Sequence, residues 1–131
     1  MKRLPLLISL CVLLGTAACS SAGVENGPLS GSARFVGDDK IDDIIERSTE
    51  RISFGRSDFA VYQVELQNQD EDDVQVEYRA RWFDADGIEV QSVTRSWKKL
   101  FIAGRSYQPV TSTAPNMEAI RCEVEVRLSE Y

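Results

Sequence analysis

Residues 74–83 are the segment that most constrains how this chain can fold. Their apolar side chains alternate strictly with polar ones, and the apolar set is Val74, Val76, Tyr78, Ala80 and Trp82. Successive side chains of a strand point to opposite faces of a sheet, so this alternation predicts a strand with one buried face. An Asp-Gly pair at 86–87 predicts a tight hairpin turn over residues 84–87, because glycine adopts positive φ without steric cost. We therefore expect a β domain built around this strand.

Five further segments have the composition of short strands, namely 60–67, 88–93, 97–102, 107–113 and 120–128. In the last of these, the polar residues predicted to face outward are Arg121, Glu123, Glu125 and Arg127. Pro109 marks the fourth as an edge strand, because proline cannot donate a ladder hydrogen bond. About seven short strands with regular turn signals predict an all-β fold. The expected architecture is a single antiparallel two-sheet sandwich of the immunoglobulin type.

The segment from residue 33 to residue 52 fits two local structures. Ile41, Ile44 and Ile45 follow a helical spacing, and the two aspartates before them could cap such a helix. The same residues also fit a strand with irregular pairing. The β character of the downstream chain favours an extended edge segment.

The N-terminus has the architecture of a secretory signal. Two cations, Lys2 and Arg3, precede an apolar run from residue 4 to residue 14. This run is shorter than the ~20 residues that cross a bilayer, and it has the length of a signal-peptide core. Residues 1–18 are therefore predicted to be a removable signal peptide. Its loss takes away both cations and changes the net charge from −6 to −8.

The residues before Cys19 resemble a bacterial lipobox, where a signal peptidase cuts ahead of a lipid-modified cysteine. Ala17 and Ala18 fit that pattern, whereas Thr16 stands where leucine is usual. The resemblance predicts lipidation of Cys19. The alternative is an ordinary signal peptide cut after Ala18, with Cys19 unmodified. By resemblance to Gram-negative lipoproteins, Ser20 favours anchoring in the outer membrane, on the periplasmic side of the envelope.

Two parts are expected after processing. Residues 19–32 are small, polar and rich in glycine and serine, which predicts a flexible tether spanning on the order of 20 Å. Residues 33–131 are expected to form the β-sandwich domain. The negative net charge repels nucleic acid, so nucleic-acid binding is excluded.

The residue inventory excludes most catalytic chemistry. The chain has no histidine, which removes Ser-His-Asp catalysis and the commonest metal ligand. Cys122 remains alone once Cys11 leaves with the signal and Cys19 carries lipid, so no disulfide forms within one chain. Cys122 also points inward and lacks the usual base, so we expect an inert thiol. No enzymatic activity and no cofactor are predicted.

Two acidic segments are candidate cation sites. Residues 84–87 look like part of a calcium loop, but Trp82 occupies a ligand position and strands flank the segment, which favours a plain turn. Residues 70–73 are four consecutive acids that a cation could bridge. A solvated loop that discourages pairing between neighbouring edges explains them better. No metal site is predicted, and a hydrolase based on Asp84 and Asp86 is disfavoured because both residues lie in a turn.

A recurring pattern of the form "N…YR..W.DA.G.E" is matched by Asn68, Tyr78, Arg79, Trp82, Asp84, Ala85, Gly87 and Glu89. The pattern resembles that of the YcfL family of bacterial lipoproteins, whose domain has no known function. Trp97 with its following strand, and Ala114-Pro115 before the closing strand, are also similar. The resemblance runs from residue 52 to the C-terminus and includes the lipidated N-terminus. It implies an immunoglobulin-like sandwich in the cell envelope, and it brings no reaction or ligand.

The outward faces of two predicted strands carry mixed charges, and arginine is favoured at protein interfaces. The predicted interaction surface consists of Gln75, Glu77, Arg79, Arg81, Arg121, Glu123, Trp97 and Tyr107. The alternative is that these charges only pair across adjacent strands on a solvated face. Trp82 lies on the apolar face and is expected in the core, whereas Trp97 stands at a strand edge.

These features predict a non-catalytic envelope module that binds another envelope protein and reaches the membrane through the lipid on Cys19. The alternative function is a small-ligand or glycan-binding module that uses the exposed aromatics Trp97 and Tyr107 together with the loop acids.

Overall fold

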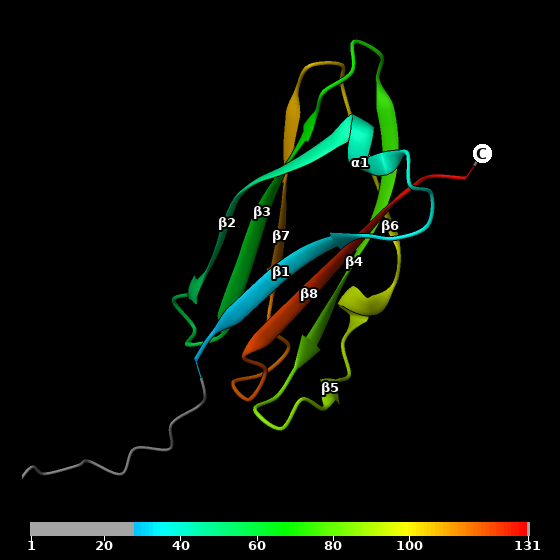
Figure 1. Cartoon of the computed structure of the whole chain (residues 1–131). Coiled ribbons are helices and arrows are strands. Elements are labelled where there is room, and N and C mark those ends of the chain that lie inside the picture. The colour runs from blue at the N-terminus through cyan, green and yellow to red at the C-terminus, as the bar shows by residue number, and fades with distance from the viewer. Residues whose placement is uncertain (1–27, 131) are drawn as a thin grey trace, which may run out of the picture.

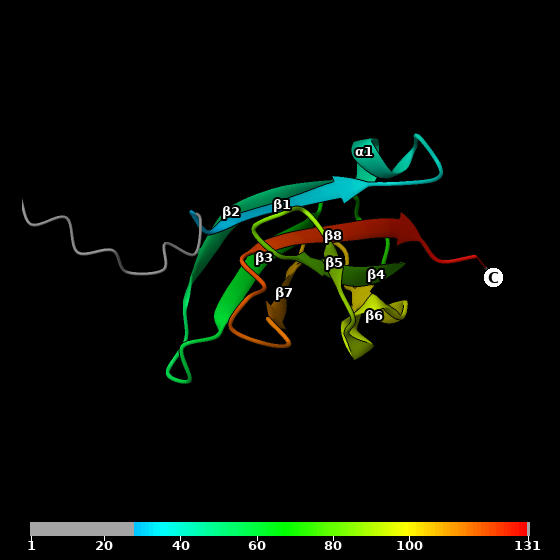
Figure 2. The same cartoon turned by 90° about the horizontal axis from the view of Figure 1, so that it is seen from below.

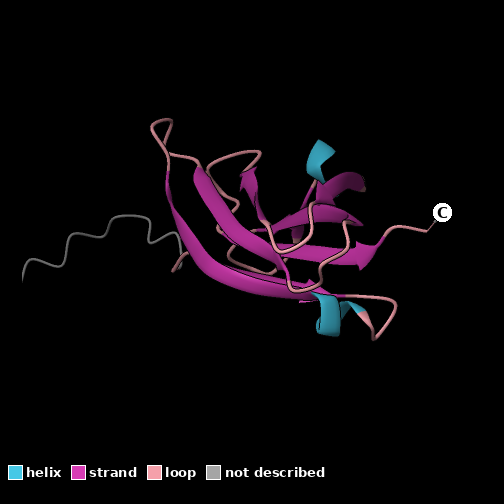
Figure 3. Cartoon of the chain, turned by 90° about the horizontal axis from the view of Figure 1, so that it is seen from above, coloured by secondary structure: helices cyan, strands magenta, loops and turns pink. Residues whose placement is uncertain are grey.

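The computed structural model describes residues 28–130, and these form eight strands in two sheets (Figure 1). The strands are β1 (Ser30–Phe35), β2 (Ile45–Phe54), β3 (Ala60–Asn68), β4 (Val74–Phe83), β5 (Glu89–Val90), β6 (Lys98–Ile102), β7 (Tyr107–Thr113) and β8 (Arg121–Leu128). Two short helical elements, α1 (Ile41–Ile44) and η1 (Val93–Arg95), complete the domain at its margins (Figure 3). The predicted two-sheet sandwich of about seven strands is confirmed.

Sheet A is organised around β4, as the alternation of residues 74–83 predicts. Its order is β1-β8-β4-β5, and β6 also pairs with β4. β4 is therefore paired with β8 along one edge and with β5 and β6 along the other. Sheet B has the order β2-β3-β7, which places β7 at an edge, as Pro109 predicts. Figure 2 shows the two sheets from one end of the sandwich.

One pairing in the sandwich is parallel. β1 and β8 run in the same direction, with Ala33 opposite Val124, while the other strand pairs are antiparallel. Parallel neighbours need a long connection, and here the whole domain lies between the first and the last strand. The prediction of an antiparallel sandwich therefore holds except at this pair.

The inward faces of the two sheets form the core. The largest fully buried side chains are Trp82 of β4 and Tyr62 of β3. The indole Nε1 of Trp82 donates a hydrogen bond of 2.9 Å to Ser112 Oγ on β7, across the sandwich. Burying indole requires a partner for its N–H, and sheet B supplies that partner. The predicted core position of Trp82 is confirmed.

The segment from residue 33 to residue 52 contains both of the structures that its sequence fits. α1 is a single turn, and β2 begins directly after it at Ile45. Ile41 and Ile45 are both buried in the core. The expected aspartate cap is absent: Lys40 occupies the N-cap without a side-chain hydrogen bond, and Asp38 accepts instead from the Lys40 backbone. The extended prediction is correct for β2 and wrong for α1.

The N-terminal boundary of the domain lies earlier than predicted. Residues 30–32 belong to β1 and not to a tether. At Gly31 there is no room for a side chain, because an added Cβ would lie 2.3 Å from the ring of Tyr62. This glycine, which is typical of a linker, is here required by packing. The predicted signal peptide, Cys19 and the rest of the tether up to residue 27 lie outside the described residues.

The free edge of β1 is closed by side chains of β2. The Arg47 guanidinium donates to the Ala33 carbonyl, and the Glu50 carboxylate accepts from Ala33 N–H at 3.1 Å. The same carboxylate oxygen accepts from the Tyr62 hydroxyl at 3.1 Å. These contacts join the two sheets and cover backbone groups that would otherwise be open to another strand.

Residues 88–93 do not form the strand that their sequence predicts. β5 covers only Glu89–Val90, and η1 begins at Val93. Thr94 of η1 donates from its hydroxyl to the Ala80 carbonyl at 3.0 Å. This hydrogen bond occupies the edge of β4 between β5 and β6, so a side chain replaces a ladder bond there.

Asn68 ties together the end of the sandwich at which β3 and β6 finish. Its buried amide donates to the carbonyl oxygens of Asp72, Ile102 and Ala103, and its Oδ1 accepts from Asp70 N–H. These hydrogen bonds hold the acidic loop of residues 70–73 against the turn between β6 and β7. An added Cβ at Gly104 would lie 1.9 Å from the Glu71 carbonyl oxygen, so the approach is too close for any other residue.

We predict that Asn68→Ala lowers the free energy of unfolding by about 1–2 kcal/mol, because buried carbonyls lose their donor. Urea denaturation of the variant and the parent checks this value. Gln69→Ala is the matched control, because the side chain of Gln69 makes an exposed hydrogen bond to Glu46. Equal stability of the two variants would contradict the prediction.

Candidate interaction surface

The outer face of sheet A is built from the polar positions of β4 and β8. The register places Glu77 opposite Arg127, Arg79 opposite Glu125, and Arg81 opposite Glu123. Every one of these cross-strand pairs joins opposite charges, which is the favourable arrangement for antiparallel neighbours. Two of these pairs form ion pairs, Arg127 with Glu77 and Arg79 with Glu125, whereas Arg81 contacts Glu89 and Glu125.

Glu125 lies at the centre of this face. Its side chain is only 3% exposed, although the sequence predicts an outward position. The carboxylate accepts hydrogen bonds from Arg34 of β1 and Arg79 of β4, and Arg81 Nη1 lies 3.7 Å from it. Burial alone would raise the pKa of Glu125, but the hydrogen bonds and charges of Arg79 and Arg34 hold this pKa below its ordinary value. Glu125 is therefore an anion enclosed by arginines.

A second carboxylate, Glu89 of β5, extends the network toward η1. It accepts from Arg81 at 2.8 Å, and Arg95 Nε lies 2.8 Å from its other oxygen. The hydrogen bond from Arg81 lowers the pKa of Glu89. Arg81 thus links the two carboxylates.

Aromatic rings lie among these arginines. The guanidinium groups of Arg79 and Arg127 lie 4.6 and 4.0 Å from the centroid of the Trp97 ring. Those of Arg81 and Arg121 lie 5.3 and 4.4 Å from the centroid of the Phe83 ring. Each distance is within the range of a cation–π interaction. The rings and the carboxylates together fix the directions of the guanidinium groups.

We call this surface the arginine face. It consists of Arg34, Glu77, Arg79, Arg81, Phe83, Glu89, Arg95, Trp97, Lys99, Arg121, Glu123, Glu125 and Arg127. Lys99 belongs to it because it lies opposite Glu77 in the register, and it is exposed.

Six of the eight residues predicted to form an interaction surface lie within the arginine face. Gln75 is exposed on the same side of β4, beyond Glu77. Tyr107 does not join them, because it lies on β7 of the other sheet, opposite Gln67. Trp97 lies against Arg79 of sheet A, so the two aromatic residues of the ligand-binding alternative belong to different sheets.

Sequence reasoning missed the contributions of Arg34, Glu89 and Arg95. Arg34 reaches Glu125 only because β1 pairs with β8, and that parallel pairing has no local signal. Arg95 reaches Glu89 because η1 folds back over the edge of β4. The alternation of β8 indicates an outward Glu125. The three arginines that enclose it come from two other strands, β1 and β4.

The core contains the thiol of Cys122 and the phenol of Tyr62. Cys122 is buried, as predicted, and burial raises the pKa of its thiol. Burial and the neighbouring charge of Glu50 raise the pKa of the Tyr62 phenol. Both groups therefore stay protonated at neutral pH.

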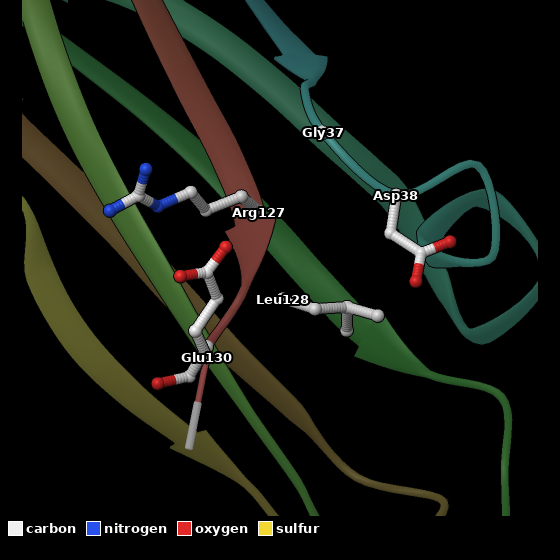
Figure 4. A pocket seen from close by; sticks show the side chains of 6 residues that line it. Gly37, Asp38, Arg127, Leu128 and Glu130 are labelled. Atoms are coloured by element: carbon white, nitrogen blue, oxygen red, sulfur yellow. The ribbon is translucent and has the colours of Figure 1, made fainter.

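One hollow borders the arginine face. It has a volume of about 380 Å³ and is lined by residues 37–38 and 127–130 (Figure 4). Its walls include the carboxylates of Asp38 and Glu130 and the apolar side chain of Leu128. These groups do not form the convergent polar set that typically orients a ligand in a pocket. The guanidinium of Arg127 bonds to Glu77 at 2.8 Å and stacks on Trp97. The guanidinium at the rim of the hollow is therefore directed toward Glu77 and Trp97.

Of the two acidic segments, residues 84–87 form a tight turn and residues 70–73 lie in the loop between β3 and β4. Asp84 Oδ1 accepts from the backbone N–H groups of Asp86 and Ile88, both at 2.9 Å, and Gly87 has a φ of 79°. Within residues 28–130, no cluster of three acidic or cysteine side chains is arranged to hold a metal ion. Over the same range, no helix is long and apolar enough to span a membrane.

The stability of the domain should depend on pH through Glu89 and Glu125. Both carboxyls have a folded-state pKa below the unfolded value, which is about 4.3 for glutamate. Their contribution is fully present above that value and is lost as the pH falls through the folded-state pKa. We predict that the free energy of unfolding is flat between about pH 7 and pH 5 and falls below about pH 4.

Urea denaturation across this pH range checks the prediction, with a variant carrying both Glu89→Gln and Glu125→Gln as the comparison. The variant should lose less stability than the parent on acidification. An identical acid dependence of the two proteins would show that other carboxyls are responsible.

A family of proteins of unknown function, DUF1425, matches residues 47–128. The chain belongs to the DUF1425 family. The match covers β3 to β8 and most of β2, so it includes the strands of the arginine face except β1. A search of curated proteins finds no match.

Two solved structures resemble this DUF1425 protein. One is a DUF1425 family member from Shewanella sp. pv-4, with a TM-score of 0.60 and 26% identity, over 66% of this chain and 80% of that chain. The other is Campylobacter jejuni cj0090, with a TM-score of 0.61 and 13% identity, over 74% of this chain and 97% of that chain. At that identity, the second likeness shows the fold alone.

Proposed function

We propose that this DUF1425 protein is a non-catalytic lipoprotein of the YcfL type, anchored in the outer membrane through Cys19. It works as an interaction module on the periplasmic side of the envelope and binds another envelope protein through the arginine face. The observation that carries this proposal is the concentration of ordered arginines and aromatic rings on one face of sheet A.

Arginine and aromatic residues are the side chains most enriched at the energetic centres of protein interfaces. On the arginine face they are held in place before any partner arrives, by Glu125, Glu89 and the two rings. Side chains that are already ordered lose less conformational entropy on binding. This preorganisation favours a role in binding a partner over the alternative, in which the charges only pair on a solvated face.

The glycan-binding alternative has less support. A sugar stacks on an open face of an indole, and the guanidinium groups of Arg79 and Arg127 lie over the ring of Trp97. Tyr107 is exposed on the other sheet. These positions favour a protein partner.

The anchor is tested by Cys19→Ala. We predict that this variant moves from the membrane pellet to the soluble periplasmic fraction, because more than one acyl chain is what gives stable attachment. Cell fractionation followed by immunoblotting measures the shift. Cys11→Ala serves as the control and should remain in the pellet. A Cys19→Ala variant that stays with the membrane would overturn the lipoprotein assignment.

The interaction surface is tested by photo-crosslinking in intact cells. Probes at Gln75 and Lys99 report on the arginine face, and a probe at Thr111 reports on the outer face of sheet B. All three positions are exposed, so the probes should not disturb the core. We expect a discrete adduct from Gln75 or Lys99 and none from Thr111. Adducts only from Thr111 would place the interaction on the other sheet.

A further inference from the structure

We propose that the arginine face binds an acidic segment of its protein partner, with aspartate and glutamate side chains of that segment seated on the arginines. This inference rests on the proposed function and adds to it the chemistry of the partner.

Charge is strongly segregated over the domain. Lys2, Arg3 and Glu25 lie outside residues 28–130, so this range contains 13 of the 15 cations and 20 of the 21 acids of the sequence. Its net charge is therefore −7. The arginine face holds six arginines and Lys99 against four glutamates, a net charge of +3. The rest of the described domain therefore carries −10. A positive surface on an acidic protein selects for negative partners.

The arginines of this face keep donors free for a ligand. A guanidinium has five N–H donors, and an ion pair with one carboxylate uses at most two or three of them. The side chains of Arg34, Arg95 and Arg121 are 57%, 42% and 42% exposed, while their carboxylate partners are 3%, 19% and 25% exposed. The glutamates thus lie beneath the guanidinium groups, which present their outer edges to solvent. Those edges match carboxylates of a partner.

Acids at both ends of the face restrict the shape of that partner. Asp38 and Glu130 follow β1 and β8 at one end, and Asp84 and Asp86 lie in the turn after β4 at the other. A broad anionic plane, such as a membrane surface, would meet these acids as well as the arginines and would be repelled by them. A single acidic segment can lie between the two ends and avoid both sets. The geometry therefore favours a peptide-like segment over a lipid surface.

The test uses the full chain in cells, with a photo-crosslinker in place of Lys99. The adduct is digested, and the crosslinked partner peptide is sequenced by mass spectrometry. We expect a peptide with a net negative charge. A variant carrying Arg95→Glu and Arg121→Glu should lower the adduct yield by about tenfold or more, as expected for reversal of interface arginines.

The matched control carries Arg51→Glu and Arg56→Glu, which make the same change in net charge on exposed residues away from sheet A. Its yield should equal that of the parent. Arg95→Gln with Arg121→Gln provides a milder pair, because it removes the cations without placing acids beside Glu89 and Glu123. This pair should also lower the yield, with thermal unfolding confirming a folded domain.

The outcomes separate the two proposals. A crosslinked peptide that is apolar or basic, an adduct that carries lipid, or a yield unchanged by both arginine pairs would overturn the acidic-segment inference alone. Absence of any adduct from Gln75 and Lys99 would overturn the proposed function together with it. An acidic peptide lost on charge reversal, and retained in the control, supports both.

Discussion

Replacing Trp82 by alanine should destabilise the domain by about 3–5 kcal/mol, because large-to-small changes of aromatic core residues leave a cavity that the surroundings fill only partly. The Trp82 side chain is fully buried between the sheets. Its removal also leaves Ser112 Oγ without the indole donor that lies 2.9 Å away. A domain of this size has a total stability of roughly 5–15 kcal/mol, so much of it would be lost.

Urea denaturation measures this loss, and Trp97→Ala is the matched control. Trp97 is half-buried and stacks on two arginines, so its removal should cost about 1 kcal/mol. Similar losses at the two tryptophans would contradict the division between a core ring and a surface ring.

Replacing Glu125 by alanine should lower the free energy of unfolding by about 2–3 kcal/mol, which is the range expected when hydrogen bonds to an enclosed charge are lost. Arg34, Arg79 and Arg81 would then face one another without their common anion. The value lies below that for a fully buried pair, because these arginines are themselves partly exposed and water screens them.

Glu123→Ala is the control, since Glu123 is more exposed and pairs with Arg121 only. It should cost less than about 1 kcal/mol. Salt adds a second readout, because the effect of Glu125→Ala should persist at high ionic strength while that of Glu123→Ala is screened. Equal effects of the two substitutions would contradict the central position of Glu125.

Local sequence patterns predict the strands whose alternation is regular. In β4, β3 and β8 a period of two assigns the buried and outward faces, and the core positions of Trp82 and Cys122 follow directly. Pro109 predicts an edge strand because its missing N–H is a property of one residue. These features need no knowledge of the distant chain.

The missed features depend on contacts between distant segments. Gly31 lies in a segment whose composition is typical of a linker. Its place in the folded domain becomes visible only through its contact with the ring of Tyr62, which is distant in sequence. Residues 91–93 belong to the predicted strand 88–93, yet the Thr94 hydroxyl takes the place of a strand partner at Ala80. The alternation of β8 predicts a solvated Glu125, whereas arginines of β1 and β4 cover its side chain in the fold.

The sequence pattern "N…YR..W.DA.G.E" has a structural explanation at several positions. Asn68 holds two loops, Asp84 and Gly87 form the turn, and Trp82 fills the core. Arg79 and Glu89 belong to the arginine face. The signature therefore specifies the sandwich together with the surface that we propose as the interaction site.

The proposed function requires that a partner covers the arginine face in the cell. Thiol labelling tests it directly, with single cysteines at Lys99 on the arginine face and at Thr111 on sheet B, both exposed positions. Cys122 is buried, and its raised thiol pKa keeps it unreactive toward a maleimide. We predict that Lys99→Cys is labelled more slowly in intact cells than in the purified protein, while Thr111→Cys is labelled equally in both. Equal labelling of Lys99→Cys in cells and in purified protein would contradict the claim.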